Sequence, residues 1–388
     1  MLFGKKIKLT ISALALCLAA MPGTHAQMRM TMEDAIATAR SQSVEALEAR
    51  QAFISTYWAW RSFRASRLPS LTLYGTLMNY NRSLVLLQNY DNGQLKYASS
   101  NNLQNNLGLK ISQNVTFTGG TVTAYTDLSR IDQFGLKNNL TWYSQPVSIS
   151  YRQPLFAYNQ FKWDKLIEPK EYERGKRIYI EAMEQITISA VEAYNNLIKA
   201  GTNHQIALTN YENTVKMRDV AKERLTLGSV TMDEYLQLEL RMLNDSISIN
   251  ETSVRVRDAQ MTLNSLLGFD ESVEVEPVLD EDLPDIMMDY DMVMEKSLGN
   301  SKFDIANEIN LLNAQSNVAK AKASRGISMS LNARFGLSNT APDIVGSYRN
   351  PLDQEVVGLS FSVPIFDWGL GKGKVQKARA AEAVVRAQ

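Results

Sequence analysis

The sequence has 388 residues, with 41 basic and 41 acidic side chains, one cysteine and two histidines. This balanced charge gives no electrostatic case for a nucleic-acid-binding protein. A single cysteine excludes a disulfide framework within the chain.

The first 26 residues have the pattern of a secretory signal peptide. Three lysines precede an apolar run at 9–21, and Thr-His-Ala ends the segment. The run is too short to span a bilayer as a helix, and no later stretch is long and apolar enough to do so. Removal of 1–26 would take away three lysines and Cys17, leaving 38 basic residues, 41 acidic residues and no thiol. Lipidation of Cys17 is the alternative, and the bulky Leu16 before it argues against that modification.

Two parts of the chain resemble each other. RASRLPSLTLYG at 64–75 aligns without a gap with KASRGISMSLNA at 322–333, an offset of 258. MEDAIATARSQS at 32–43 aligns with YDMVMEKSLGNS at 290–301 at the same offset. Such self-similarity indicates a duplicated architecture.

Each copy is predicted to begin with a helix of about thirty residues, at 31–66 in the first copy. Thr31, three residues before Asp34, begins a capping box, and Asp289 is an N-cap candidate in the second copy. The first copy is expected to occupy 27–168, and the second 292–388.

A strand pattern with a period of two follows each helix and recurs in VSISYRQPLFAYN at 147–159 and LSFSVPIFDWG at 359–369. The predicted strands are 70–78, 145–154, 328–337 and 356–364. The segment from strand entry to closing proline spans 85 residues in the first copy and 37 in the second, a difference of 48. Much of that difference is 107–128, which is predicted to be an inserted hairpin that turns at Gly119-Gly120.

These strands have one apolar and one polar face. The larger apolar residues, predicted to face lipid, are Leu71, Leu73, Ile149, Leu331, Phe335, Leu359 and Phe361. The polar residues, predicted to face a lumen, are Thr72, Ser148, Ser330, Asn332 and Ser360. A soluble β-sandwich is the alternative, but strands of about ten residues with this alternation favour a membrane barrel. Four strands cannot close without bare edges in lipid, so several chains would have to share one barrel.

The strongest helical signal lies at 169–268, between the two copies. Mostly apolar residues recur there at alternating spacings of four and three, which indicates a coiled-coil hairpin. The first seam consists of Ala190, Tyr194, Leu197, Gly201, His204, Leu208, Tyr211 and Val215 on one helix and of Leu238, Met242, Asp245, Ile249, Thr252, Val256, Ala259, Leu263 and Leu266 on the other. The second seam consists of Leu236, Leu240, Leu243, Ile247 and Val254, so the returning helix is predicted to have neighbours on both sides. A helix over 170–226 would be ~85 Å long. The polar seam residues fit either the wall of a water-filled tube or a solid coiled coil with imperfect layers.

The hairpin turns in RLTLGSVTMDEYL at 224–236. Gly228 is suited to the position just after a helix, and Ser229 or Thr231 can cap the next helix. A plain helix–turn–helix would account for every residue in this segment.

Three further features bear on enzymatic or metal chemistry. The linker at 269–291 is acidic, with ten acids and no basic residue at 270–291, but it lacks a calcium-loop motif and is predicted to be solvated. GLGKGKV at 369–375 lacks the spacing of a phosphate-binding loop. His204 lies in the first seam, where a structural role is favoured over that of a ligand or base.

These pieces, in this order, resemble the TolC-type outer-membrane efflux channel family over essentially the whole chain after the signal peptide. The resemblance is carried by the Ala-Ser-Arg-Leu-Pro strand entry, by the strand exits QPLFAYN and VPIFDWGLGKGK, by the turn RLTLGSVTMDEYL and by LNSLLGFD at 263–270.

The resemblance implies a mainly α-helical protein with membrane β-structure. Three chains would share a twelve-stranded barrel in the outer membrane, four strands from each, and the helices would continue as a tube through the periplasm. The turn would contact a periplasmic adaptor through Gly228, Ser229, Val230, Thr231 and Asp233. The second long hairpin of the family does not follow before Gln388, so the sequence is predicted to be truncated at its C-terminus.

The predicted function is a passive exit duct in an efflux or type I secretion system. It would be a homotrimer coupled through an adaptor (membrane fusion) protein to an inner-membrane pump, with no catalytic, cofactor-binding or metal-binding residues. A soluble periplasmic coiled-coil adaptor or scaffold is the alternative.

Overall fold

The computed structural model describes residues 28–88, 95–135, 138–279 and 289–387. The chain divides into two compact units. The first consists of the residues up to Ile54 and Lys176–Lys296, and the second of Ser55–Gly175 and Ser297–Gln388. The predicted signal peptide and the middle of the predicted acidic linker, 280–288, lie outside the described residues.

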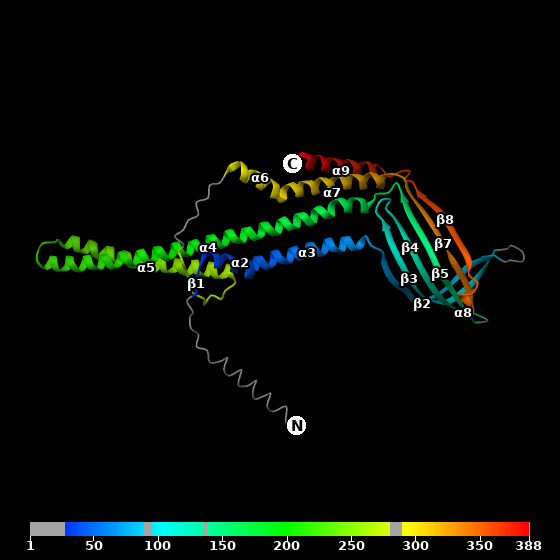
Figure 1. Cartoon of the computed structure of the whole chain (residues 1–388), viewed down its shortest axis with the longest axis horizontal. Coiled ribbons are helices and arrows are strands. Elements are labelled where there is room, and N and C mark those ends of the chain that lie inside the picture. Colours follow the sequence, from blue (N-terminus) through cyan, green and yellow to red (C-terminus); the bar gives the residue numbers. More distant parts are fainter. Residues whose placement is uncertain (1–27, 89–94, 136–137, 280–288, 388) are drawn as a thin grey trace, which may run out of the picture. The chain divides into compact units, whose positions relative to one another are not determined.

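The first unit is helical and contains one small sheet (Figure 1). Its elements are β1 (Met28–Met30), α2 (Met32–Gln42), the start of α3 (Val44–Ser66), most of α4 (Gln160–Thr226), α5 (Met232–Leu267), β6 (Val275–Pro277) and the start of α6 (Tyr290–Asn300). β1 and β6 pair in parallel, although they are far apart in the sequence.

The core of the first unit lies where α2, α4, α5 and the small sheet meet. Its fully buried apolar side chains include Ala35, Ala39, Leu263 and Leu267. The Tyr194 hydroxyl, on α4, lies 2.9 Å from the carbonyl oxygen of Met30 and 2.7 Å from that of Val278. A buried phenol needs such a partner, so these contacts tie the helix to the segments that carry β1 and β6.

The start of the first repeat contains two helices where the sequence predicted one over 31–66. The predicted capping box is present, since Thr31 Oγ1 accepts the Asp34 N–H at 3.2 Å and the Asp34 carboxylate accepts the Thr31 N–H at 3.3 Å. The helix then stops at Ser43, whose ψ of 150° is extended. Ser43 Oγ accepts the N–H of Ala46 at 3.0 Å, so this serine caps α3 instead of continuing α2.

The second repeat has the same break. Ser301, at the repeat offset of 258 from Ser43, caps α7 (Lys302–Arg325) by accepting the N–H of Phe303 at 3.0 Å. The strands that follow begin at Ser70 and at Ser328, which differ by the same offset. The duplication predicted from the sequence is therefore visible in the order of helix, serine cap, helix and strand.

The long hairpin consists of α4 and α5. The sequence predicted its start at 169, but α4 already begins at Gln160 and carries Pro169 inside the helix. Proline lacks an N–H, so one backbone hydrogen bond is missing there. A helix of 67 residues is ~100 Å long.

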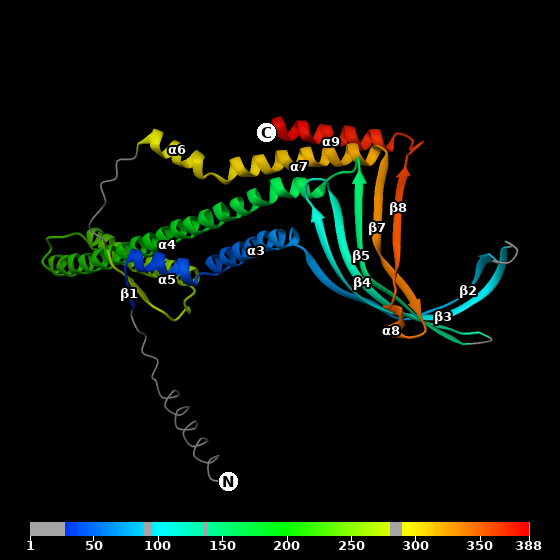
Figure 2. The same ribbon diagram turned by 45° about the vertical axis from the view of Figure 1, so that its right-hand side comes forward.

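The second unit contains a six-stranded antiparallel sheet with the order β2-β3-β4-β5-β7-β8 (Figure 2). The strands are β2 (Ser70–Gln88), β3 (Leu95–Val115), β4 (Gly120–Gln133), β5 (Asn139–Leu155), β7 (Ser328–Ala341) and β8 (Leu352–Ser362). The sequence predicted four strands per chain and an inserted hairpin at 107–128. The segment does turn at Gly119, whose φ is +77°, but β3 and β4 are inserted between β2 and β5 as full members of the sheet.

The strands in the structure are longer than the strands that the alternating pattern of the sequence predicted. In β2 the pattern ends where the register shifts between Thr76 and Asn79, and Met78 has a φ of +60°. The Asn105 side chain accepts the Met78 N–H at 2.7 Å, and that of Asn106 accepts the Thr76 N–H at 2.9 Å. Such a bulge interrupts the period of two while the pairing continues beyond it.

Short helices accompany the sheet. α8 (Ile344–Ser347) lies between β7 and β8, and α9 (Leu370–Ala387) follows β8 and runs alongside α7 in both views (Figures 1 and 2). Within the described ranges, none of the helices has the length and apolar character needed to cross a membrane.

Candidate functional site

The pairing register sorts the strand side chains into two faces, because directly paired residues lie on the same face of an antiparallel sheet. Ile149 pairs with Phe335, and Leu331 pairs with Leu359. Following the ladders, we define the apolar face by the seven predicted lipid-facing residues, Leu71, Leu73, Ile149, Leu331, Phe335, Leu359 and Phe361. The polar face carries the five predicted lumen-facing residues, Thr72, Ser148, Ser330, Asn332 and Ser360. The register thus separates the two predicted sets, while the surroundings of each face stay a prediction.

The two faces differ in crowding. On the apolar face Leu71 is 70% exposed, and Ile149 and Phe335 are each 49% exposed. On the polar face the much smaller Ser148 and Ser129 are 0% and 3% exposed. The polar face is therefore crowded in the middle of the sheet, around β4 and β5, while Thr72, Asn332 and Ser360 on its outer strands are exposed.

A polar network lies on the crowded face. Asp127 is 8% exposed, and its carboxylate accepts hydrogen bonds from Asn106 Nδ2 at 3.2 Å and from Ser129 Oγ at 3.0 Å. The Tyr74 hydroxyl is a third partner. Together these neutral donors satisfy a buried carboxylate.

The polar face also carries basic residues that the sequence analysis did not single out. Lys110, Arg152 and Arg334 lie on it, because they pair with Thr72, Asn332 and Ser150 respectively. Lys110 lies within 107–128, the segment that the sequence predicts to be an inserted hairpin. The alternation in LGLKISQN would have assigned it to the face of Ser112.

The two edges of the sheet are β2 and β8, each of which pairs on one side only within the described residues. Long unpaired edges are templates for pairing with another strand. Both edges of the sheet therefore have backbone groups that could pair with a further strand.

The first seam of the helical hairpin contains polar contacts. His204 Nδ1 lies 3.0 Å from Thr252 Oγ1, and Thr214 Oγ1 donates to Asp245 Oδ2 at 2.6 Å. Thr214 is buried, so its hydroxyl needs this partner. His204 has a structural partner, as the sequence indicated. The second seam is open, with Leu236, Leu240, Leu243, Ile247 and Val254 between 48% and 60% exposed.

The turn of the hairpin has the predicted backbone. Gly228 has a φ of +73°, its N–H donates to the Leu225 carbonyl at 3.1 Å, and the Ser229 N–H donates to the Arg224 carbonyl at 3.0 Å. This is a Schellman motif, in which a left-handed glycine ends the helix. A Cβ at Gly228 would meet no atom within 4 Å, so strain at this position would come from the backbone alone.

Thr231, not Ser229, caps α5. Thr231 Oγ1 accepts the Glu234 N–H at 3.3 Å, and the Glu234 carboxylate accepts the Thr231 N–H at 2.9 Å. The second of these hydrogen bonds holds the pKa of Glu234 below its ordinary value. Ser229, Thr231 and Asp233 are exposed, whereas Val230 is half-buried.

Val230 lines a shallow groove of about 540 Å³ beside the turn. Met217, Val220 and Leu238 supply apolar atoms to this groove, and Lys216, Arg224 and Glu234 supply charged ones. The predicted contact residues therefore adjoin a surface that has both an apolar floor and charged positions.

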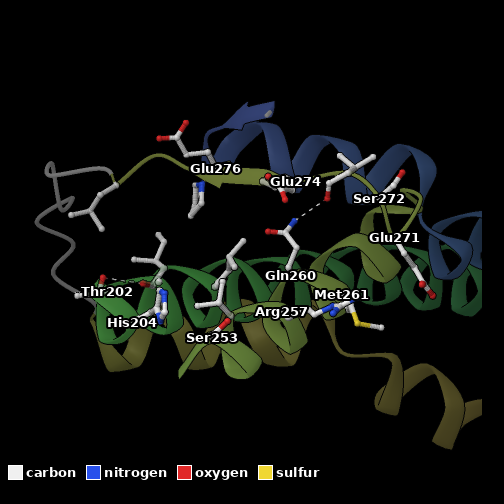
Figure 3. Close-up of a pocket in the computed structure, with 18 residues that line it drawn as sticks. Thr202, His204, Ser253, Arg257, Gln260, Met261, Glu271, Ser272, Glu274 and Glu276 are labelled. Carbon is white, nitrogen blue, oxygen red and sulfur yellow. Dashed lines mark hydrogen bonds between the residues drawn. The ribbon is translucent and has the colours of Figure 1, made fainter. Parts of the chain in front are cut away.

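A larger groove of about 900 Å³ lies between the hairpin and the strand segment 271–279 (Figure 3). Leu197, Val256 and Met261 line it from the helices. The side-chain amide of Gln260 bonds to the backbone of the strand segment. Figure 3 also shows Arg257 on the helix side and Glu271, Glu274 and Glu276 on the strand side. In the described ranges, no three His, Cys, Asp or Glu side chains are arranged to hold a metal ion.

The loop at 369–375 contains an internal ligand for its amides. The Asp367 carboxylate accepts the N–H of Gly369 at 3.0 Å and that of Gly371 at 2.7 Å. These hydrogen bonds hold the pKa of Asp367 below its ordinary value, the Gly371 N–H contributing most. These two amides are thus already paired with a side chain of the protein.

Solved structures provide the comparison with known proteins. No protein-family model and no curated protein matches the sequence. CusC, a transmembrane channel, has a TM-score of 0.60 and 15% identity, with 94% of this chain and 73% of that chain covered. The outer-membrane protein VceC of Vibrio cholerae has a TM-score of 0.61 and 16% identity, with 92% and 74% covered. The CmeC outer-membrane channel of Campylobacter jejuni has a TM-score of 0.60 and 14% identity, with 92% and 66% covered.

These similarities extend over both units of the chain, including the helices and the sheet. At such low identity they establish the fold alone. The chain has the fold of the TolC-type outer-membrane channels, the family that its sequence motifs resemble.

Proposed function

We propose that the protein is an outer-membrane channel subunit, a passive exit duct of an efflux or type I secretion system. The sheet forms part of a barrel in the outer membrane, with the apolar face toward lipid and the polar face toward the lumen. The helices extend into the periplasm. An adaptor protein docks at the turn, and an inner-membrane pump supplies the energy.

The observation that carries this proposal is the separation of the two faces on a sheet with free edges. Six of the seven apolar-face side chains are exposed and Leu331 is half-buried, whereas the polar face carries small polar side chains, of which Ser148 and Ser129 are buried. A water-soluble protein rarely exposes a continuous apolar surface of this extent. A barrel wall needs this arrangement, with apolar residues outside and polar residues inside.

Closure requires further copies of the chain. The edges β2 and β8 cannot stay unpaired in lipid, because each unsatisfied backbone group costs several kcal/mol there. In the predicted trimer, six strands from each chain would make a barrel of eighteen strands instead of the twelve expected from four. Barrels of sixteen to eighteen strands enclose an aqueous channel.

The turn is suited to docking. Gly228, Ser229, Val230, Thr231 and Asp233 form its surface, and Val230 adjoins the groove between the helix ends. Small residues allow another backbone to approach closely, and the half-buried valine offers an apolar anchor.

A soluble periplasmic scaffold is the competing function, and the exposed apolar face argues against it. The resemblance to channels also suggests a protein without catalytic activity. Membrane fractionation tests the proposal. Recovery from the outer membrane only with detergent is the expected result, whereas release in buffer or high salt would contradict it.

A further inference from the structure

The charged residues of the polar face are mostly of one sign. Across the described parts of β2, β3, β4, β5, β7 and β8, the register assigns four basic residues to this face, Lys96, Lys110, Arg152 and Arg334, but only one acid, Asp127. The apolar face has the opposite balance, with Arg82 and Arg130 against Asp132, Asp353 and Glu355. The excess of positive charge is thus specific to the crowded face.

Lys110, Arg152 and Arg334 lie in three successive rows of paired residues on the polar face. Arg152 pairs with Asn332 and Arg334 with Ser150, so the two guanidinium groups start from diagonal positions on adjacent strands. Lys110 lies in the same row of paired residues as Tyr125 and Ser148. This row is the next one on the polar face, further from the end of β5 that leads into α4. Together the three side chains form a basic band across β3, β5 and β7.

No acid neutralises this band. Among the described residues, none of the three basic side chains forms an ion pair, and two of them lie over aromatic rings. Lys110 Nζ lies 5.5 Å from the ring centre of Tyr74, and the Arg334 guanidinium lies 5.9 Å from that of Tyr125. Such contacts orient a cation without cancelling its charge. Positive charges that lie close together repel each other, so their grouping on one face is unfavourable for folding.

The single acid of the face is held differently. The Asp127 carboxylate is buried and satisfied by Asn106, Ser129 and Tyr74, as described above. Lys110 is half-buried, and Arg152 and Arg334 are exposed. A permeating solute would therefore meet the basic groups more directly than the acid.

We propose that this band makes the duct selective for anions, so that its substrates are anionic solutes. The inference rests on the proposed function, in which the polar face lines the lumen. Rings of Lys and Arg are a common basis of anion selectivity, because a narrow path lined by one sign of charge concentrates the opposite ions. If several copies of the chain share one lumen, each copy contributes its own three basic residues to the wall.

The test is the reversal potential of the full-length protein in planar bilayers under a potassium chloride gradient. The wild-type protein is expected to give a chloride-to-potassium permeability ratio above one. The triple variant Lys110→Gln/Arg152→Gln/Arg334→Gln should lower the ratio, because it removes the three basic groups of the band and leaves Asp127 in place. A cation-selective wild-type protein, or a ratio that the triple variant leaves unchanged, would overturn the inference alone.

Two further variants separate charge from folding. Arg152→Lys/Arg334→Lys keeps the charge and should keep the wild-type ratio. Arg82→Gln removes a positive charge from the apolar face and should also leave the ratio unchanged. An equal shift with Arg82→Gln would overturn the assignment to the polar face. Absence of current from correctly assembled wild-type protein would instead refute the proposed exit duct, and the inference with it.

Discussion

Replacement of Leu331 by arginine tests the orientation of the sheet. Leu331 pairs with Leu359 on the apolar face, and the neighbouring pairs on this face contain Phe361 on one side and Val357 on the other. The next apolar-face position of β8 is the acidic Glu355, which indicates the limit of the apolar band on this strand. Leu359 is four residues from Glu355, ~13 Å along the strand and ~9 Å along the membrane normal at a tilt of about 45°. This depth is near the middle of an apolar band ~25 Å tall.

A lipid-facing arginine near mid-bilayer costs ~2–4 kcal/mol. Leu331→Arg should therefore lower the equilibrium constant for folding of each chain into the membrane by about 30-fold to 700-fold. Two substitutions are matched controls. Ser330→Arg adds the same side chain on the polar face, opposite Ser360, and should be tolerated. Leu337→Arg is on the apolar face beyond Glu355, opposite Asp353, and should cost about 0–1 kcal/mol.

The measurement is a urea titration of folding into lipid vesicles, together with the amount of assembled protein in the outer membrane. Equal losses with Leu331→Arg and Ser330→Arg would refute the assignment of the two faces. Equal losses with Leu331→Arg and Leu337→Arg would refute the depth derived from Glu355.

Three further predictions concern the helical hairpin. Gly228→Val should abolish transport without changing the amount of assembled protein, because its left-handed backbone adds ~1–2 kcal/mol of strain and the side chain adds bulk at the docking surface. Gly228→Asn, which tolerates that backbone, should transport better, and full transport by the valine variant would mean that the turn has no docking role. The cap at Thr231 should weaken in acid, because the folded pKa of Glu234 is lowered from 4.5: its stabilisation is present above pH 4.5 and is lost as pH falls through the folded pKa. Hydrogen exchange at the turn checks this, and Glu234→Gln should remove the pH dependence, so an unchanged profile would contradict the assignment. Thr214→Val should destabilise the hairpin by about 1–3 kcal/mol in thermal unfolding because it leaves Asp245 without its buried partner, whereas the exposed Thr209→Val should have little effect.

Local features of the sequence predicted the repeated plan of the chain. The capping box at Thr31 and the left-handed glycine at Gly228 depend on a few neighbouring residues, and both are present in the structure. Alternation over short strands also predicted which residues lie on opposite faces, as for Leu331 and Ser330. These features are local, because a cap or a face is decided by residues only a few positions apart.

The number of strands and the basic band depended on the tertiary structure. The sequence could not show that 95–133 pairs between β2 and β5, because strand order is decided by contacts between residues far apart in the chain. The bulge near Met78 interrupted the alternation, so the pattern ended before the strand did. Lys110, Arg152 and Arg334 lie on three different strands, and only the register between those strands assigns them to one face. The sequence by itself therefore determined the repeat, the hairpin and the alternation of each strand, whereas pairing across long separations decided the width of the sheet and the charge of its polar face.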